Sequence, residues 1–226
     1  MENINQKLNW LRAAVLGGND GIVSISAVVV GMAGATNDLK IILTASVASL
    51  IAGALSMAVG EYVSVSSQRD TEKALIEKER HEINNNPEEE LKELVSIYEK
   101  EGLSKETALL VAKEFTAHDV HAAHFHAELG INPNNLTNPL HASCASAIAF
   151  LFGGIIPLFT ITISPPSIRV PVTFFTVLCV LIVIGILSTH AGGAKKINAT
   201  VRVVIGGLLA MLVTYGIGEI FGVIGI

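Results

Sequence analysis

Residues 41–83 read IILTASVASLIAGALSMAVGEYVSVSSQRDTEKALIEKERHEI, and this stretch decides the fold. Its first part, residues 41–67, is apolar and carries a single charged side chain, Glu61. A helix rises 1.5 Å per residue and the hydrocarbon core of a bilayer is about 30 Å thick, so a span needs about 20 apolar residues. The second part is densely charged, and neither Pro nor Gly separates it from Glu61. The stretch therefore predicts a membrane-spanning helix that continues without a break into a polar region.

Four further apolar segments are long enough to span a membrane. Together with the first they cover residues 11–35, 41–67, 142–163, 170–190 and 201–226. Only 15% of the residues are charged, against about 25% in soluble domains, which excludes a disordered protein and disfavours an ordinary soluble enzyme. We therefore predict an all-α integral membrane protein with five transmembrane helices and a three-helix cytoplasmic insert between spans two and three.

Most of the charge lies in one block, residues 67–138. The block holds 15 of the 20 acidic side chains and 8 of the 15 basic ones, a net charge of −7, and five of the seven histidines. Asn84-Asn85-Asn86-Pro87 and Gly102 divide it into three helices, the last of which ends at Gly130. We expect three regions: residues 1–67 with spans one and two, residues 68–138 as an acidic helical metal-binding domain, and residues 139–226 with spans three to five.

Basic residues in the short loops predict the orientation. Five of them fall on the side of the N-terminus and two on the opposite side. They are Lys7, Arg12, Lys195, Lys196 and Arg202, and on the opposite side Lys40 and Arg169. We therefore expect the N-terminus, the insert and the loop before the last span in the cytoplasm, and the C-terminus outside. No organellar targeting signal is visible, so the plasma membrane is the expected location in a prokaryote.

Ionisable groups inside the spans are candidates for an ion path, because charge is costly in hydrocarbon. Asp20 lies between glycines of the first span, which let another helix approach closely. Glu61 follows Met57 by one helical turn, and a thioether beside carboxylates suits a transition metal better than magnesium or calcium. Asp20, Met57 and Glu61 form the predicted transport path. A carboxylate at the cytoplasmic end of the helix is the equally weighted alternative for Glu61, and Glu219 is expected to be an interfacial carboxylate that reaches water.

In the insert, carboxylates recur three residues apart, and two histidines share one helix face with a glutamate. Glu and His on neighbouring helices are the ligands with which helical bundles hold Fe, Mn or Zn. Glutamates at this spacing are also common on solvated helix faces, so the concentration of histidines is what favours metal binding. The predicted metal ligands are Glu79, Glu82, Glu90, Glu93, His121, His124 and Glu128.

Two stretches carry a family resemblance. Residues 16–23, LGGNDGIV, and residues 56–70, SMAVGEYVSVSSQRD, resemble the first two spans of the vacuolar iron transporter family. The resemblance implies a five-span homodimer that moves Fe²⁺, and often Mn²⁺, out of the cytosol in exchange for protons, along a path between the two copies of the first span. It implies that Asp20 and Met57 are transport residues and that the five insert glutamates bind metal. His124 stands near the place where some members have methionine, and is the substitute ligand.

We thus expect a transporter and not an enzyme. Its partners are protons, the lipid bilayer, a second copy of the chain and divalent ions, namely Fe²⁺ with Mn²⁺, Zn²⁺ or Co²⁺ as further candidates. Two GxxxG motifs offer surfaces for the second copy, and the net charge of −5 argues against nucleic acid. The alternative is a membrane-anchored ferritin-like metal oxidase or a metal sensor, but the Glu-x-x-His spacing of di-iron sites is absent. A transporter of an organic solute is a third reading, although broken-helix repeats are not seen.

Overall fold

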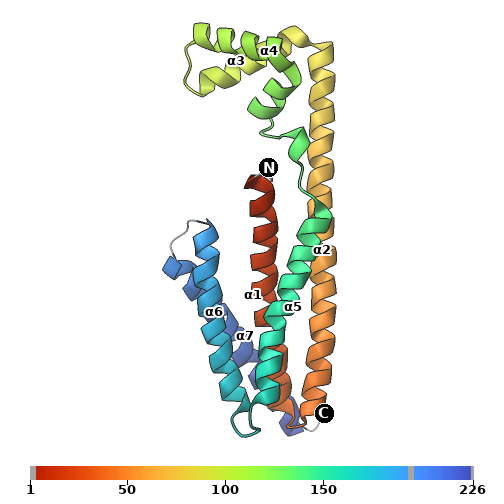
Figure 1. The fold of residues 1–226 in the computed structure, drawn as a ribbon, viewed down its shortest axis with the longest axis vertical. Helices are drawn as coiled ribbons and strands as arrows, with labels where there is room; N and C mark the ends of the chain where they lie inside the picture. Colours follow the sequence, from red (N-terminus) through yellow and green to blue (C-terminus); the bar gives the residue numbers. More distant parts are fainter. Residues whose placement is uncertain (1–3, 193–195, 225–226) are drawn as a thin grey trace. The chain divides into compact units, whose positions relative to one another are not determined.

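The computed structural model describes residues 4–192 and 196–224, and every regular element in these ranges is a helix (Figure 1). The order is α1 (Ile4–Ala35), α2 (Leu39–Asn85), α3 (Pro87–Lys100), α4 (Lys105–Ala127), the 3-10 helix η1 (Pro133–Asn135), α5 (Pro139–Ile163), α6 (Arg169–Gly192) and α7 (Lys196–Ile224). The chain forms two compact units, one built mainly from Ser64–Asn138 and one from Lys7–Val63 with Pro139–Ile226. We call them the insert unit and the membrane unit. The predicted all-α class is confirmed.

Five helices are long and apolar enough to cross a membrane, namely α1, α2, α5, α6 and α7. The prediction of five spans is therefore confirmed. The apolar part of α2, residues 41–67, ends before the charged part that belongs to the insert unit. Residues 225–226 of the predicted last span lie outside the described residues, as do Lys195 and the side chains of Lys7 and Lys196.

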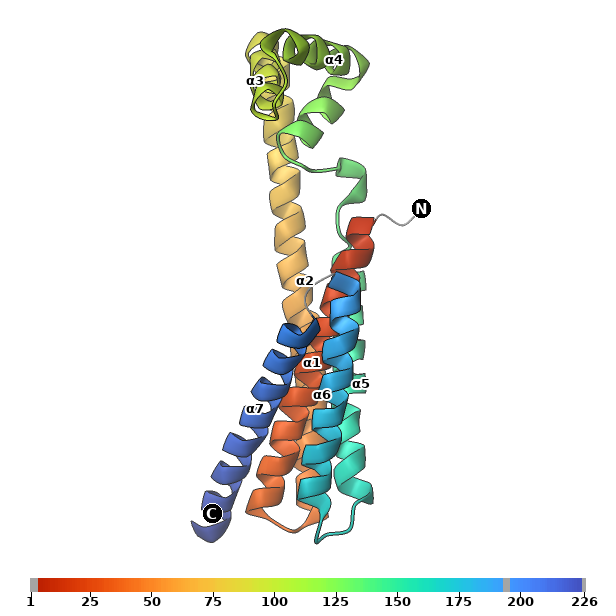
Figure 2. The same cartoon turned by 90° about the vertical axis from the view of Figure 1, so that its left-hand side faces the viewer.

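Glycines bring α1 into close contact with α5 and α7 in the membrane unit (Figure 2). A Cβ added at Gly21 would collide with the carbonyl oxygen of Phe150 on α5, and one at Gly218 on α7 would collide with that of Gly31. Buried apolar side chains pack around these contacts, with Phe150 in one cluster and Met211 in another. Both GxxxG motifs therefore serve contacts within the chain, which corrects their assignment to a second copy.

In the insert unit, α3 and α4 pack against each other around Leu94, Ala112 and Ala123. The helix boundaries follow the sequence signals, because α2 ends before Asn86 and Pro87 opens α3. The charged first helix expected for the insert is the second part of α2, so α2 runs from Leu39 to Asn85 without interruption.

The third helix expected for the insert is not one regular helix. In α4 the backbone of Asp119 is extended, with φ −160° and ψ 97°, and the helix restarts after it. The Asp119 carboxylate accepts a hydrogen bond of 3.0 Å from the Ala122 N–H, which caps the second segment. His118 therefore does not continue the helix face that carries His121 and His124.

Candidate metal centre

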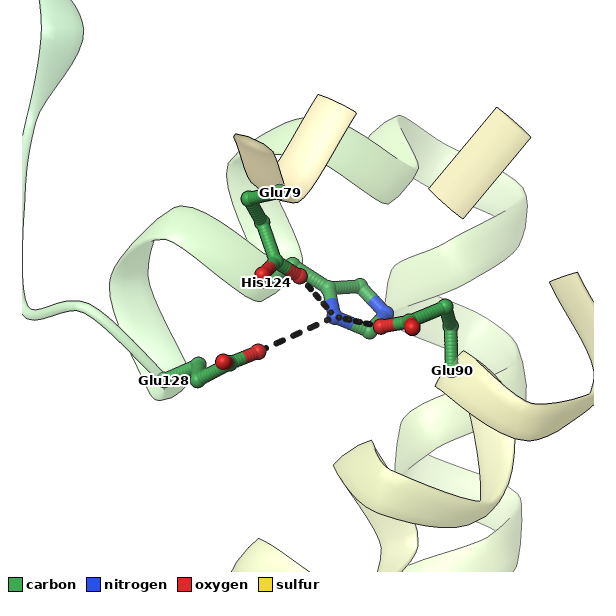
Figure 3. Close-up of side chains that lie close together, drawn as sticks. All are labelled: Glu79, Glu90, His124 and Glu128. Atoms are coloured by element: carbon green, nitrogen blue, oxygen red, sulfur yellow. Dashed lines mark ion pairs between the residues drawn. The ribbon is translucent and has the colours of Figure 1, made fainter. Parts of the chain in front are cut away.

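Four side chains of the insert unit converge on one point (Figure 3). Glu79 lies on α2, Glu90 on α3 and His124 on α4, and Glu128 is the residue that directly follows α4. The Nδ1 atom of His124 lies 3.0 Å from Glu79 Oε1, 3.6 Å from Glu90 Oε2 and 3.9 Å from Glu128 Oε2. One ligand atom from each residue lies within 4.8 Å of all the others, which is close enough for one ion to contact all four. We call these residues the Glu/His cluster.

The Glu/His cluster is buried. The side chains of His124 and Glu79 are 1% and 3% exposed, and those of Glu90 and Glu128 are 11% and 26% exposed. Glu79 Oε1 and His124 Nδ1 lie close to each other, but within the described part of the chain neither of them, nor His124 Nε2, has a hydrogen bond of regular geometry. A buried polar atom without a partner costs about 1–3 kcal/mol. A cation coordinated by these atoms would remove that cost.

Burial and mutual repulsion shift the protonation of the cluster. The pKa of Glu79 is raised to about 8, mainly because the side chain is buried. A hydrogen bond with Glu128 and the negative charge of Glu128 are the next largest causes. Burial, then the charge of Glu93, also raises the pKa of Glu90. Burial lowers the pKa of His124, although the nearby Glu128 opposes this shift. At neutral pH the imidazole is therefore uncharged and able to donate a lone pair, while a proton occupies Glu79.

The donor set of three carboxylates and one imidazole indicates a transition metal. Imidazole suits Fe²⁺ and Zn²⁺, carboxylate suits Mn²⁺, and Co²⁺ follows Fe²⁺ in the usual order of affinity, whereas magnesium and calcium prefer sites built from oxygen alone. A divalent ion would displace the proton of Glu79 and offset the repulsion among the carboxylates. The same donor set does not distinguish among these four ions.

Three of the seven predicted ligands lie outside the Glu/His cluster. Glu82 forms an ion pair of 3.2 Å with Lys78, and Glu93 is exposed. The ring of His121 stacks on Phe125 with the ring centroids 5.8 Å apart. Residues three apart on a helix are offset by about 60° around its axis. When one side chain of such a pair points into the cluster, the other therefore lies beside the cluster and not in it.

The membrane unit places the predicted path residues on two helices. Asp20 is exposed on α1 and accepts a hydrogen bond of 3.1 Å from Ser24. Met57 on α2 packs against a buried apolar cluster. The Glu61 side chain is 10% exposed and lies 3.6 Å from the guanidinium of Arg12, which is itself exposed, so Glu61 is a half-buried carboxylate with a charged partner.

Sequence reasoning missed the pairing of Arg12 with Glu61. Arg12 contributes only to the predicted orientation, although it lies near the start of the first span and Glu61 lies near the end of the second. Because consecutive spans joined by a short turn run antiparallel, the two residues belong at the same end of the bundle. That topology is the signal that points to the pair.

Known proteins resemble this chain over most of its length. A model of the VIT family matches residues 11–219. The vacuolar iron transporter of Acanthamoeba castellanii is 41% identical over 216 residues, which cover 92% of this chain and 77% of that protein. Vacuolar iron transporter homolog 2.1 of Arabidopsis thaliana is 33% identical over 218 residues, covering 96% and 84%, and homolog 2 of Oryza sativa subsp. japonica is 33% identical over 219 residues, covering 96% and 94%. These relatives are named as transporters and not as enzymes, and the matched residues 11–219 contain the Glu/His cluster, three whole candidate spans and most of the first and last. The chain therefore belongs to the VIT family of transporters.

Proposed function

We propose that this protein carries Fe²⁺ out of the cytosol and that its insert captures the ion first. The observation that carries the proposal is the Glu/His cluster, a buried group of four ligands in a chain with five candidate spans. The names of the relatives support iron as the substrate. The same set of carboxylates and imidazole also accepts Mn²⁺, Co²⁺ and Zn²⁺, which are therefore further candidate substrates of the transporter.

Capture is favoured by the charge of the insert. Its net charge of −7 attracts cations and raises their concentration near the Glu/His cluster. The cluster contains one histidine, whereas ferritin-like di-iron sites use a Glu-x-x-His motif on each of two helices. The site therefore supports binding of a single ion better than oxidation at a di-iron centre.

Passage through the membrane would use Glu61 and Met57 and then Asp20. Asp20 is exposed on the surface of the single chain, and a charged group facing hydrocarbon is costly. A second copy that covers this face of α1 would remove the cost, which supports a homodimer with the path between the two α1 helices. Protons arriving from the outer side would neutralise the carboxylates of Asp20 and Glu61 and release the metal.

Uptake of Fe²⁺ into proteoliposomes under anaerobic conditions tests the proposal. With a pH gradient across the membrane, we expect uptake by the unchanged protein and none by Asp20→Ala. Asp38→Asn is the matched control, because Asp38 lies exposed in the turn between α1 and α2. A pH-sensitive dye should report proton movement coupled to uptake. Equal uptake by Asp20→Ala and the control variant would refute the path, and uptake without proton movement would refute the antiport.

A further inference from the structure

Apart from the Glu/His cluster, a polar pocket lies at the end of the membrane unit where a short turn joins α1 to α2. It is a pocket of about 460 Å³ lined by the last turn of α1, the segment between α5 and α6, the first residues of α6 and the last turns of α7. Its polar side chains are those of Thr36, Asn37, Ser167, Tyr215 and Glu219. Glu219, which is exposed as expected for a carboxylate that reaches water, is the one charged residue that lines it among the described residues. The transport path and the Glu/His cluster use none of these groups.

Glu219 is held in place by Tyr215. The Tyr215 hydroxyl donates a hydrogen bond of 2.6 Å to Glu219 Oε1. This length is typical of a hydroxyl that donates to an ionised carboxylate, for which O–H···O⁻ distances are about 2.5–2.7 Å. The two residues lie one helical turn apart on α7, so the helix itself sets their spacing.

Two other helices fix the tyrosine. The ring of Phe174 on α6 meets the Tyr215 ring edge-on, with centroids 6.4 Å apart and an interplanar angle of 84°. Gly34 on α1 lies against the same residue, since a Cβ there would lie 2.7 Å from the Tyr215 carbonyl oxygen and 3.2 Å from its ring. Three helices therefore position the Tyr215–Glu219 pair independently of any ligand.

The surroundings of Glu219 favour a cation. The last turn of α1 lines the pocket, and the C-terminal end of a helix carries free carbonyl groups and a negative partial charge. Arg169, which is 6% exposed, donates through Nη1 to the carbonyl oxygen of Asn37, and it does not line the pocket. Within the described part of the chain, no ion pair involves Glu219.

The pocket and Glu61 lie at opposite ends of the membrane unit. Glu61 pairs with Arg12 near the start of α1, whereas Ala33, at the end of α1, lines the pocket. The length of helix from Arg12 to Ala33 is about 30 Å, which is also the thickness of the hydrocarbon core. An ion that enters beside Glu61 and crosses the membrane would arrive at the end that holds Glu219.

We propose that the pocket binds a divalent metal ion through Glu219, positioned by Tyr215, and that the transported ion leaves the protein from this site. The release role rests on the proposed transport function. Oxygen atoms are the only ligands that the pocket offers, in contrast to the imidazole of the Glu/His cluster. Transition metals such as Fe²⁺ bind oxygen ligands less tightly than sites that include imidazole, so the ion would be captured firmly in the insert and released readily here.

Binding is tested by ¹⁹F NMR on the full chain in nanodiscs, with its three tyrosines replaced by 3-fluorotyrosine and Mn²⁺ as the paramagnetic probe. The Tyr215 signal is assigned from its absence in Tyr215→Phe. We expect Mn²⁺ to broaden this signal in the unchanged protein and not in Glu219→Gln. Asp38→Asn, which removes a carboxylate at the same end but outside the pocket lining, should behave as the unchanged protein. The signals of Tyr62 and Tyr98 report whether Glu219→Gln is folded.

Broadening of the Tyr215 signal that persists in Glu219→Gln, or that is absent from the unchanged protein, would overturn the site. The release role is tested by adding Mn²⁺ to the pocket side of proteoliposomes during Fe²⁺ uptake. We expect Mn²⁺ to inhibit, and Glu219→Gln to need about tenfold more Mn²⁺ for the same inhibition, an effect of about 1.4 kcal/mol. Transport with unchanged inhibition would overturn only the release role. Mn²⁺ binding beside Tyr215 without any Fe²⁺ transport would instead overturn the proposed function and the release role with it.

Discussion

His124 illustrates how single residues determine the chemistry of the insert. Its ring is almost fully buried among three carboxylates, and neither ring nitrogen has a hydrogen bond of regular geometry within the described residues. Burial lowers the pKa of His124 and raises those of Glu79 and Glu90, so the metal-free cluster carries less charge than its composition suggests. A metal ion and protons therefore compete for the same atoms.

This competition predicts that metal binding to the insert depends on pH. Because the pKa of Glu79 is about 8, Mn²⁺ must displace a proton from Glu79 at any lower pH. We expect the affinity to rise about tenfold per pH unit from about pH 6 to about pH 8 and then to level off. Isothermal titration calorimetry in buffers of different ionisation enthalpy measures both the affinity and the proton released.

Glu79→Gln is the control for the pH prediction. It removes the titrating group while keeping its size, so binding should be weak and the proton release associated with Glu79 should disappear. Glu77→Gln changes an exposed glutamate on the same helix and should leave both quantities unchanged. An affinity of the unchanged protein that stays constant from about pH 6 to about pH 8 would contradict the raised pKa of Glu79.

At the scale of the elements, helix ends and close helix contacts position the functional groups. The break of α4 at Asp119 starts a new segment that carries His124, and the Asp119 carboxylate caps this segment. The glycines of α1 remove the bulk that would otherwise hold α5 and α7 away. Both features are local, and each can be altered without touching a proposed ligand.

Removing the cap should disturb the metal centre indirectly. Asp119→Ala deletes the acceptor for the Ala122 N–H, and loss of an N-cap typically costs about 1 kcal/mol. The break then loses its stabilisation, and His124 is held less firmly in the cluster. We expect Mn²⁺ affinity to fall by up to about tenfold in titration calorimetry, because 1.4 kcal/mol corresponds to a factor of ten. Asp119→Asn keeps a capping oxygen and should bind almost normally, whereas unchanged affinity in Asp119→Ala would show that the cap plays no such part.

The contact between α1 and α5 should tolerate no added methyl group at Gly21. A Cβ at this position meets the carbonyl oxygen of Phe150, which is backbone and cannot turn aside. Overpacking of this kind typically costs about 1–3 kcal/mol, so Gly21→Ala should lower the melting temperature of the protein in detergent. In Gly18→Ala the nearest atom is 3.8 Å away, an ordinary contact, and this variant should melt like the unchanged protein. Equal melting of the two variants would be inconsistent with the close helix contact.

At the scale of the whole molecule, five spans carry the chain from one side of the membrane to the other. Because this number is odd, we expect the first residues of α1 and the last residues of α7 on opposite sides. The excess of basic residues predicts that the insert lies in the cytoplasm and the turn between α1 and α2 outside. The acidic insert would then face the compartment from which iron is taken.

Labelling of single cysteines in intact cells checks this orientation. Cys144 and Cys179 are free, so both are first replaced by alanine. We expect a membrane-impermeant maleimide to label Asp38→Cys, in the turn between α1 and α2. The same reagent should label Glu106→Cys in the insert only after the cells are opened, because it cannot cross the membrane into the cytoplasm. The reverse pattern would invert the orientation and the direction of transport that follows from it.

The sequence by itself determined the number of spans, the helical insert and the types of ligand available. These are local properties, because apolar length defines a span and proline, asparagine and glycine mark where helices end. It did not determine which candidates meet. Residues three apart on a helix are offset by about 60° around its axis, so the spacing alone did not show that Glu79 and Glu90 join the cluster while Glu82 and Glu93 do not.

Only the tertiary structure selected the four residues that converge and paired Arg12 with Glu61. Only the tertiary structure brought the end of α1, the start of α6 and the last turns of α7 together to form the pocket that Glu219 lines. A sequence specifies each helix through neighbours a few residues away. A binding site instead depends on how helices that are distant in the chain are rotated and packed against one another, and close packing fixes that only once the whole chain has folded.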